Sequence, residues 1–229
     1  PVLHAGKLYV VLLHRGAQLI VALDAATGKE LWHVTRKSDG RGESPDVYAS
    51  PFVWENGGRA LLIVHGNDYC TAHELADGSE VWRVGELNPK AKYNMAWRAV
   101  SSPLVTPDLI VIPSCKNGVT VGLDPLKAKG DIGPGHPAEL WRLPSGTPDV
   151  PSPVRVGDTV LLMGERGDLT PIDAKTGKVG DKLRVTNERH RANPVAADGK
   201  VYLVGRDGSC VVVKAGREPE VLAKNKLPD

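Results

Sequence analysis

Four side chains that could bind a partner stand shortly before four recurring dipeptides in this sequence of 229 residues. Each dipeptide is a small polar residue followed by proline, namely Ser50-Pro51, Ser102-Pro103, Ser152-Pro153 and Asn193-Pro194. The side chains ahead of them are Tyr48, Arg98, Asp149 and Arg191. An aromatic ring, two guanidinium groups and a carboxylate can hold another molecule through stacking, ion pairs and hydrogen bonds. These residue types therefore indicate recognition, and no catalytic residue is expected.

Histidine and cysteine, which often serve in catalysis and metal binding, occur here without the required spacing. His190 lies between Arg189 and Arg191, whose positive charge is expected to lower its pKa and weaken it as a base. The other six histidines form no pairs two or four residues apart that would indicate a metal site. The three cysteines are widely separated and are interpreted as small buried apolar residues: Cys70, Cys115 and Cys210. We expect no metal ligand and no cofactor-binding residue.

The composition limits the classes of partner. Apolar residues make up 41% of the chain and charged residues 24%, enough to bury a substantial core. The formal charge is only +2, so no nucleic acid is expected as a partner. No run of about 18 apolar residues occurs, so no transmembrane segment is expected. The partner is expected to be a protein or a small molecule, and the chain a monomer or part of a longer chain.

The recurring prolines mark an internal repeat, which predicts the elements that must position these side chains. With Pro1 as the first member, the prolines are separated by 50, 52, 50 and 41 residues. Each unit has a short extended piece and three further apolar strands, separated by polar or glycine-containing turns. Such repeats predict an all-β fold, a β-propeller of four-stranded antiparallel blades. About five blades are expected, over residues 1–49, 50–101, 102–151, 152–192 and 193–229.

The clearest unit contains a hairpin between residues 21 and 32. Asp24, Thr27 and Gly28 form its turn, because the polar side chains can bond backbone groups and the glycine can take a positive φ. Trp32 follows in the last strand and is expected to cover the joint with a neighbouring blade. The third unit carries a Gly/Pro-rich insertion at residues 127–135. The fourth unit lacks the tryptophan, and Leu183 is its expected substitute.

In a propeller, the connections between blades gather near the mouth of the central channel, and binding residues often lie on such loops. Two of these connections are long, at residues 35–49 and 85–101. The candidate binding residues at the channel mouth are therefore Tyr48, Arg98, Asp149, His190 and Arg191. Solvated loop residues, together with ion pairs lining the channel, are the alternative interpretation.

The hairpin also matches a known repeat. The pattern Ala-x-Asp-x-x-Thr-Gly-x-x-x-Trp is matched at every fixed position from Ala22 to Trp32, and in part from Asp173 to Gly177. The second unit matches loosely through three residues: Ala72, Gly78 and Trp82. Over nearly its whole length the chain resembles the PQQ-like β-propeller repeat family. The resemblance implies a fold, and a fold alone does not determine a function.

Three kinds of protein in this family imply three different functions. Quinoprotein dehydrogenases hold pyrroloquinoline quinone (PQQ) with a Ca²⁺ or lanthanide ion, and they usually carry two adjacent disulfide-bonded cysteines. This chain has no Cys-Cys dipeptide. The propeller lipoprotein of the outer-membrane barrel-assembly machinery binds partner proteins. Secreted bacterial proteins without demonstrated chemistry form the third kind, which this chain resembles most closely.

The resemblance therefore implies a non-catalytic binding or scaffold module without a cofactor, in the periplasm, the cell envelope or the extracellular space. One alternative is a fragment of a PQQ-dependent alcohol or sugar dehydrogenase, which would hold PQQ with Ca²⁺. The other alternative is a propeller of the barrel-assembly type. The chain is expected to be a fragment of a larger ring, with a complete five-bladed ring as the alternative.

Overall fold

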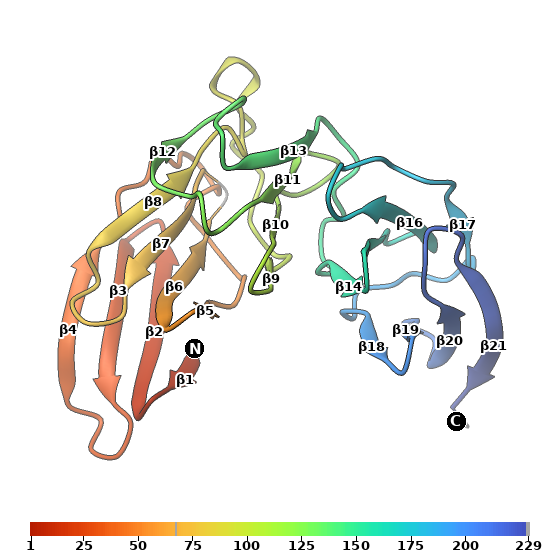
Figure 1. Cartoon of the computed structure of the whole chain (residues 1–229), viewed down its shortest axis with the longest axis horizontal. Helices are drawn as coiled ribbons and strands as arrows, with labels where there is room; N and C mark the ends of the chain where they lie inside the picture. The colour runs from red at the N-terminus through yellow and green to blue at the C-terminus, as the bar shows by residue number, and fades with distance from the viewer. Residues whose placement is uncertain (67, 228–229) are drawn as a thin grey trace.

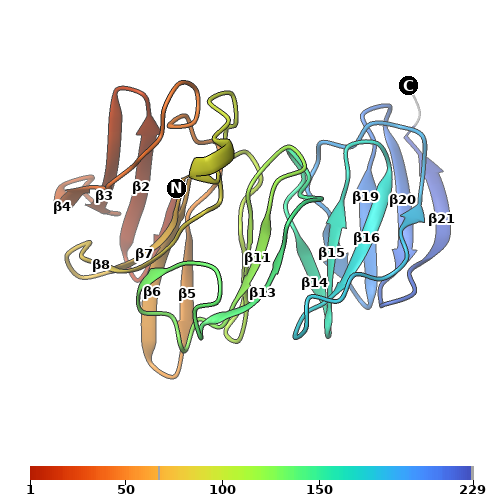
Figure 2. The ribbon, with the colours of Figure 1, turned by 90° about the horizontal axis from the view of Figure 1, so that it is seen from above.

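Five β-sheets follow one another along an arc in the computed structural model, which describes residues 1–66 and 68–227 (Figure 1). Each sheet begins with a short strand on the concave side of the arc and ends with a strand on the outer side. Seen from above, the sheets stand face to face in series (Figure 2). The predicted all-β propeller of four-stranded antiparallel blades is confirmed, and the sheets are called blades 1 to 5 in chain order.

Blade 1 contains β1 (Val2–His4), β2 (Lys7–His14), β3 (Ala17–Asp24) and β4 (Glu30–Thr35). Blade 2 contains β5 (Phe52–Asn56), β6 (Arg59–His65), β7 (Cys70–Glu74) and β8 (Glu80–Val84). Blade 3 contains β9 (Leu104–Val105), β10 (Ile110–Pro113), β11 (Thr120–Leu123) and β13 (Glu139–Leu143). Blade 4 contains β14 (Val154–Val156), β15 (Thr159–Met163), β16 (Asp168–Asp173) and β17 (Leu183–Arg184). Blade 5 contains β18 (Val195–Ala197), β19 (Lys200–Val204), β20 (Ser209–Lys214) and β21 (Glu220–Lys226).

The insertion of the third unit forms a strand that belongs to a different blade. Strand β12 (Gly130–Ile132) pairs parallel with β8, so blade 2 has five strands. The last strand of a blade leaves backbone groups unpaired along its outer edge, and β12 satisfies part of that edge on blade 2. The sequence predicted only a longer turn at this position. Within the described ranges, the one helical segment is a 3-10 turn at Lys90–Lys92.

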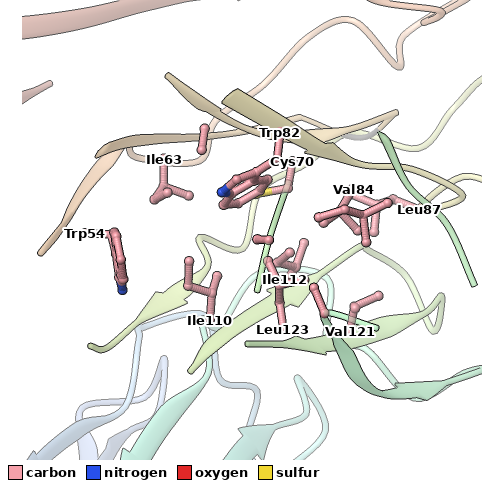
Figure 3. Close-up of a cluster of buried hydrophobic side chains, with 14 of the residues drawn as sticks. Trp54, Ile63, Cys70, Trp82, Val84, Leu87, Ile110, Ile112, Val121 and Leu123 are labelled. Atoms are coloured by element: carbon pink, nitrogen blue, oxygen red, sulfur yellow. The ribbon is translucent and has the colours of Figure 1, made fainter. Parts of the chain in front are cut away.

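Apolar side chains fill the four joints between neighbouring blades. The pleat of a strand sends alternate side chains to opposite faces, so β6 serves two joints at once. Leu62 and Val64 pack toward blade 1, whereas Leu61 and Ile63 pack toward blade 3. Figure 3 shows the joint between blades 2 and 3, where Trp82 lies among the aliphatic side chains of both blades. Two further clusters fill the joints between blades 3 and 4 and between blades 4 and 5.

The last-strand tryptophans connect each blade to the next one. The indole Nε1 of Trp32 donates to the Leu75 carbonyl in the first turn residue after β7, at 3.3 Å. Trp141 of blade 3 donates in the same way to the Ala174 carbonyl of blade 4, at 2.9 Å. Trp82 is 1% exposed and packs in its joint, without a hydrogen bond to any described residue. The predicted role of these rings as covers of the joints is confirmed.

Two of these rings, those of Trp32 and Trp141, lie on the turn glycines of the next blade. A Cβ added at Gly78 would lie 2.6 Å from the ring of Trp32, and one at Gly177 would lie 2.5 Å from Trp141. Both glycines also have a φ above +70°, which side chains rarely adopt. Gly28 of blade 1 has the same φ of +72°, but no atom lies within 4 Å of its added Cβ. In blades 2 and 4 the turn residue must be glycine for two reasons, the positive φ and the ring that covers it. In blade 1 only the positive φ requires a glycine.

Blade 4 closes without a tryptophan. Leu183 pairs with Leu169, which is the register that Val34 has in blade 1 opposite Ile20. The third strand of this blade carries Pro171 at the position of Ala22, and the Gly180 amide donates to the Pro171 carbonyl at 2.9 Å. The expectation that Leu183 substitutes for the tryptophan is therefore wrong, because Leu183 takes the position of Val34, two residues beyond that of Trp32.

The residues before the recurring prolines form a hydrogen-bonded series across the blades. The Ser102 hydroxyl accepts the Ser50 amide at 2.9 Å, and the Ser152 hydroxyl accepts the Ser102 amide at 2.9 Å. The Asn193 side chain accepts the Ser152 amide at 2.8 Å. Each side chain thus holds the equivalent backbone position of the preceding blade. This explains why a small polar residue with a short side-chain acceptor recurs here.

The repeat aspartates form turns, as the sequence predicted. Asp24 accepts the amide and hydroxyl of Thr27 at 2.8 and 2.7 Å, and Asp173 accepts both groups of Thr176 at 2.8 Å. These hydrogen bonds lower the pKa of both carboxyl groups. The aspartates therefore serve the architecture of the blades.

A buried ion pair joins the connection after blade 1 to blade 2. Arg36 Nη2 lies 3.2 Å from Asp68 Oδ1, and both side chains are more than nine-tenths buried. Burial alone would raise the pKa of Asp68, but the Arg36 charge and hydrogen bonds from Ser38 and Asp39 lower it overall. His65 is buried beside this pair. Burial lowers the pKa of His65 from 6.5 to about 4, and the positive charge of Arg36 acts in the same direction.

Truncation of Trp82 to alanine should lower the free energy of unfolding by about 3–5 kcal/mol, because it empties a fully buried site between two blades. Trp32→Ala should cost less, because that ring is only partly buried. Urea unfolding monitored by circular dichroism measures both. A loss below about 1 kcal/mol for Trp82→Ala would contradict the assigned blade register.

His65 should make stability fall as the pH is lowered from about 6.5 to about 4. In this range the unfolded chain binds a proton at His65 and the folded chain does not, so protonation favours unfolding. The lowered pKa of His65 corresponds to a loss of roughly 3 kcal/mol in the free energy of unfolding at about pH 4. The variant His65→Gln should lose that part of the pH dependence, whereas His33→Gln, at an exposed position, should retain it. Equal pH profiles for the wild type and His65→Gln would refute the prediction.

Candidate functional site

The connections between blades are held against the neighbouring blades, so their side chains have defined positions. Val47 and Ala99 form a parallel bridge, and the Tyr48 amide donates to the Ala99 carbonyl at 2.7 Å. This bond ties the connection after blade 1 to the connection after blade 2. The His190 amide donates to the Glu165 carbonyl at 3.0 Å, which ties the connection after blade 4 to the loop between β15 and β16.

Tyr48 and Arg98 lie against each other. The guanidinium carbon of Arg98 is 5.9 Å from the centroid of the Tyr48 ring, within the range of a cation–π contact. Arg98 Nε also lies 3.5 Å from a carboxylate oxygen of Glu43. The Tyr48 side chain is exposed, with 61% of its surface accessible. The pair thus presents an ordered aromatic ring to solvent beside a positive charge.

Asp149 lies on the next connection, between blades 3 and 4. Burial raises its pKa, and the nearby Glu165 carboxylate acts in the same direction, whereas Lys116, Arg191 and Arg98 oppose the rise. Arg98 and Arg191 are therefore both within electrostatic reach of Asp149. No described residue donates a hydrogen bond to its Oδ1. We call these four residues, which the sequence predicts to lie at the channel mouth, the channel-mouth row: Tyr48, Arg98, Asp149 and Arg191.

His190 does not belong to the exposed part of this row. Its side chain is buried, and its Nδ1 donates to the Val204 carbonyl at 3.0 Å. Its pKa is lowered, as the sequence analysis expected, but the cause is burial, which the carboxylates of Asp207 and Glu188 oppose. The adjacent Arg191 is exposed. The structure therefore separates two neighbours that the sequence analysis had grouped.

Two further charged residues lie beside the row and were missed from the sequence. Lys116 and Glu165 are in the loops after β10 and β15, outside the connections between blades. The Glu165 carboxylate accepts the backbone amides of Asp149 and Val150, the latter at 2.8 Å. It therefore fixes the backbone that carries the Asp149 side chain. The sequence offered only the turn residues Asn117-Gly118 as a signal, and in the structure Lys116 and Asn117 both take a positive φ.

The side-chain types of this row are suited to recognition. Tyrosine and arginine are enriched in protein interfaces because each offers a large contact area and a polar group. Among residues 1–66 and 68–227, no three His, Cys, Asp or Glu side chains converge to hold a metal ion. The same residues include no helix long and apolar enough to cross a membrane.

Solved structures with the same fold differ in what their names describe. BamB from Moraxella catarrhalis superposes with a TM-score of 0.69 at 14% identity, over 98% of this chain and 62% of that one. Quinohemoprotein alcohol dehydrogenase from Comamonas testosteroni superposes with a TM-score of 0.69 at 14% identity, over 100% of this chain and 42% of that one. The computationally designed Ika8 protein gives a TM-score of 0.65 at 13% identity, over 98% of this chain and 60% of that one.

These likenesses show the fold, and the chain spans less than two thirds of each of the three structures. A search of the curated proteins found no match. A comparison with protein-family models gives a more specific result. The model described as "Outer membrane protein assembly factor BamB" matches residues 1–132 and 129–218, and the chain therefore belongs to this family of PQQ-like propellers.

Proposed function

We propose that this propeller is a non-catalytic module that binds a protein partner through the channel-mouth row. The observation that carries the proposal is the exposed ring of Tyr48, held by the Arg98 guanidinium at 5.9 Å. A ring that is ordered before binding loses little conformational freedom on association. The charges of Asp149 and Arg191 on the following connections would extend the contact around the mouth and add specificity.

The family supports a location and a class of partner. Its model is described as an outer membrane protein assembly factor, so we place the chain in the cell envelope, with an outer-membrane assembly component as its partner. The dehydrogenase among the structural neighbours supports a second candidate, a fragment of a quinoprotein enzyme.

A photo-crosslinking amino acid at position 48 tests the binding proposal in cells that produce the protein. It should crosslink to a discrete envelope protein, and Arg98→Ala should reduce the yield about tenfold, which corresponds to roughly 1.4 kcal/mol of affinity. The control places the same amino acid at Leu126, which is 63% exposed in the turn before β12. Equal crosslinking from both positions, or no effect of Arg98→Ala, would refute the proposal. A titration of the purified chain with PQQ and Ca²⁺ that shifts the quinone absorbance would favour the enzyme.

A further inference from the structure

A second surface lies on blade 2 and shares no lining residue with the channel-mouth row. It is a groove of about 730 Å³ between the outer end of β8, strand β12 and the two connections on either side of blade 2. Strand β12 lies along β8 at the outer edge of the blade (Figure 1). The volume is within the range of pockets that bind small molecules or a few side chains. We call it the blade 2 groove.

One wall of the groove is built around Arg83. Its guanidinium forms two hydrogen bonds with Glu80, at 2.6 and 2.7 Å, and lies 4.5 Å from the centroid of the Tyr69 ring. Asp131 of β12 is 3.8 Å from Arg83 Nε. The Arg83 guanidinium thus already interacts with three groups of the chain: the Glu80 carboxylate, the Tyr69 ring and the Asp131 carboxylate. The insertion that forms β12 supplies the outermost carboxylate of this wall.

The opposite wall is also ordered. The Tyr69 hydroxyl donates to Asp39, and Lys90 lies 3.4 Å from the same carboxylate. The hydrogen bond from Tyr69 and the charge of Lys90 lower the pKa of Asp39, so it is ionised at neutral pH. Tyr93 lines the groove with one ring face covered by Arg41, whose guanidinium carbon is 4.6 Å from the centroid. Two tyrosines therefore stand in fixed positions beside charged groups.

The charges that line the groove are mostly negative. Five carboxylates line it, Asp39, Asp68, Glu80, Glu86 and Asp131, against three cations, Lys37, Arg83 and Lys90. The buried Arg36 neutralises Asp68, and the wall contacts neutralise Glu80 and Asp39. Two carboxylates remain at the rim: Glu86, which is exposed and makes no ion pair with any described residue, and Asp131, which is 94% exposed and only 3.8 Å from an arginine that Glu80 already binds. Lys37 is the one lining cation without an ion pair to a described residue, so the rim keeps a net negative charge of one.

We propose that the blade 2 groove binds an extended basic segment of a partner protein, with an arginine or lysine side chain placed between Glu86 and Asp131. The rim charge is complementary to such a side chain, and the tyrosines offer aromatic surface for its aliphatic part. The chain as a whole carries a formal charge of +2, so its overall field does not attract a basic peptide. Binding of such a peptide would therefore be due to the carboxylates at the rim of the groove and not to the overall charge of the chain.

The test is a titration of the full chain against fluorescein-labelled (Gly-Arg-Ser)₄, followed by fluorescence anisotropy. The basic peptide should bind, and the matched (Gly-Glu-Ser)₄ peptide should bind at least tenfold more weakly. The double variant Glu86→Gln/Asp131→Asn should weaken binding of the basic peptide about tenfold. The control variant Asp181→Asn/Glu218→Gln removes the same charge from two exposed positions outside the groove lining and should leave binding unchanged.

Absence of binding, tighter binding of the acidic peptide, or an equal loss in both double variants would overturn the proposal. All four substituted side chains are exposed, so the unfolding midpoints of both variants should match that of the wild type, which confirms that folded proteins are compared. No substitution touches the channel-mouth row. A failure here therefore leaves the crosslinking test at position 48 unaffected, and the two proposals can be judged separately.

Discussion

In two of the four joints between blades, an indole ring lies on the turn glycine of the next blade, and this contact constrains the repeat more than any other. It constrains both partners, because the ring needs a glycine beneath it, and the turn needs a positive φ that glycine adopts readily. The strand beside the ring must also carry a small residue, which is Ala22 opposite Trp32 and Gly122 opposite Trp141. One contact thus explains three positions of the repeat pattern. Where the ring and the glycine meet, these positions cannot vary independently.

A second series of contacts holds the blades on their inner side. The hydrogen bonds that run from Ser50 through Ser102 and Ser152 to Asn193 lie next to the channel-mouth row in sequence. The tryptophan contacts fix the outer ends of the blades, and the serine series fixes the connections between them. A rigid frame of this kind allows the exposed residues to differ from blade to blade. Both surfaces proposed for binding lie where the repeats differ, on the connections and on the β12 insertion.

Much of the fold could be predicted because its determinants are local. The hairpin from Ala22 to Trp32 contains its own turn residues and its own ring, so the repeat can be recognised from the sequence of a single unit. What could not be predicted depends on contacts between units. The pairing of β12 with β8 joins residues from two units, and the burial of His190 depends on blade 5. The blade 2 groove combines four separate segments of chain, and no spacing within a single repeat indicates it.

The most direct test of the ring-on-glycine contact is the loss of unfolding free energy in Gly177→Ala compared with Gly28→Ala. Both glycines have nearly the same φ, +71° and +72°, but only Gly177 lies under a ring. Gly28→Ala should cost about 1–2 kcal/mol, the strain of a left-handed backbone. Gly177→Ala should cost roughly 2 kcal/mol more, because its Cβ would overlap the Trp141 ring. Equal losses for the two variants would contradict the account.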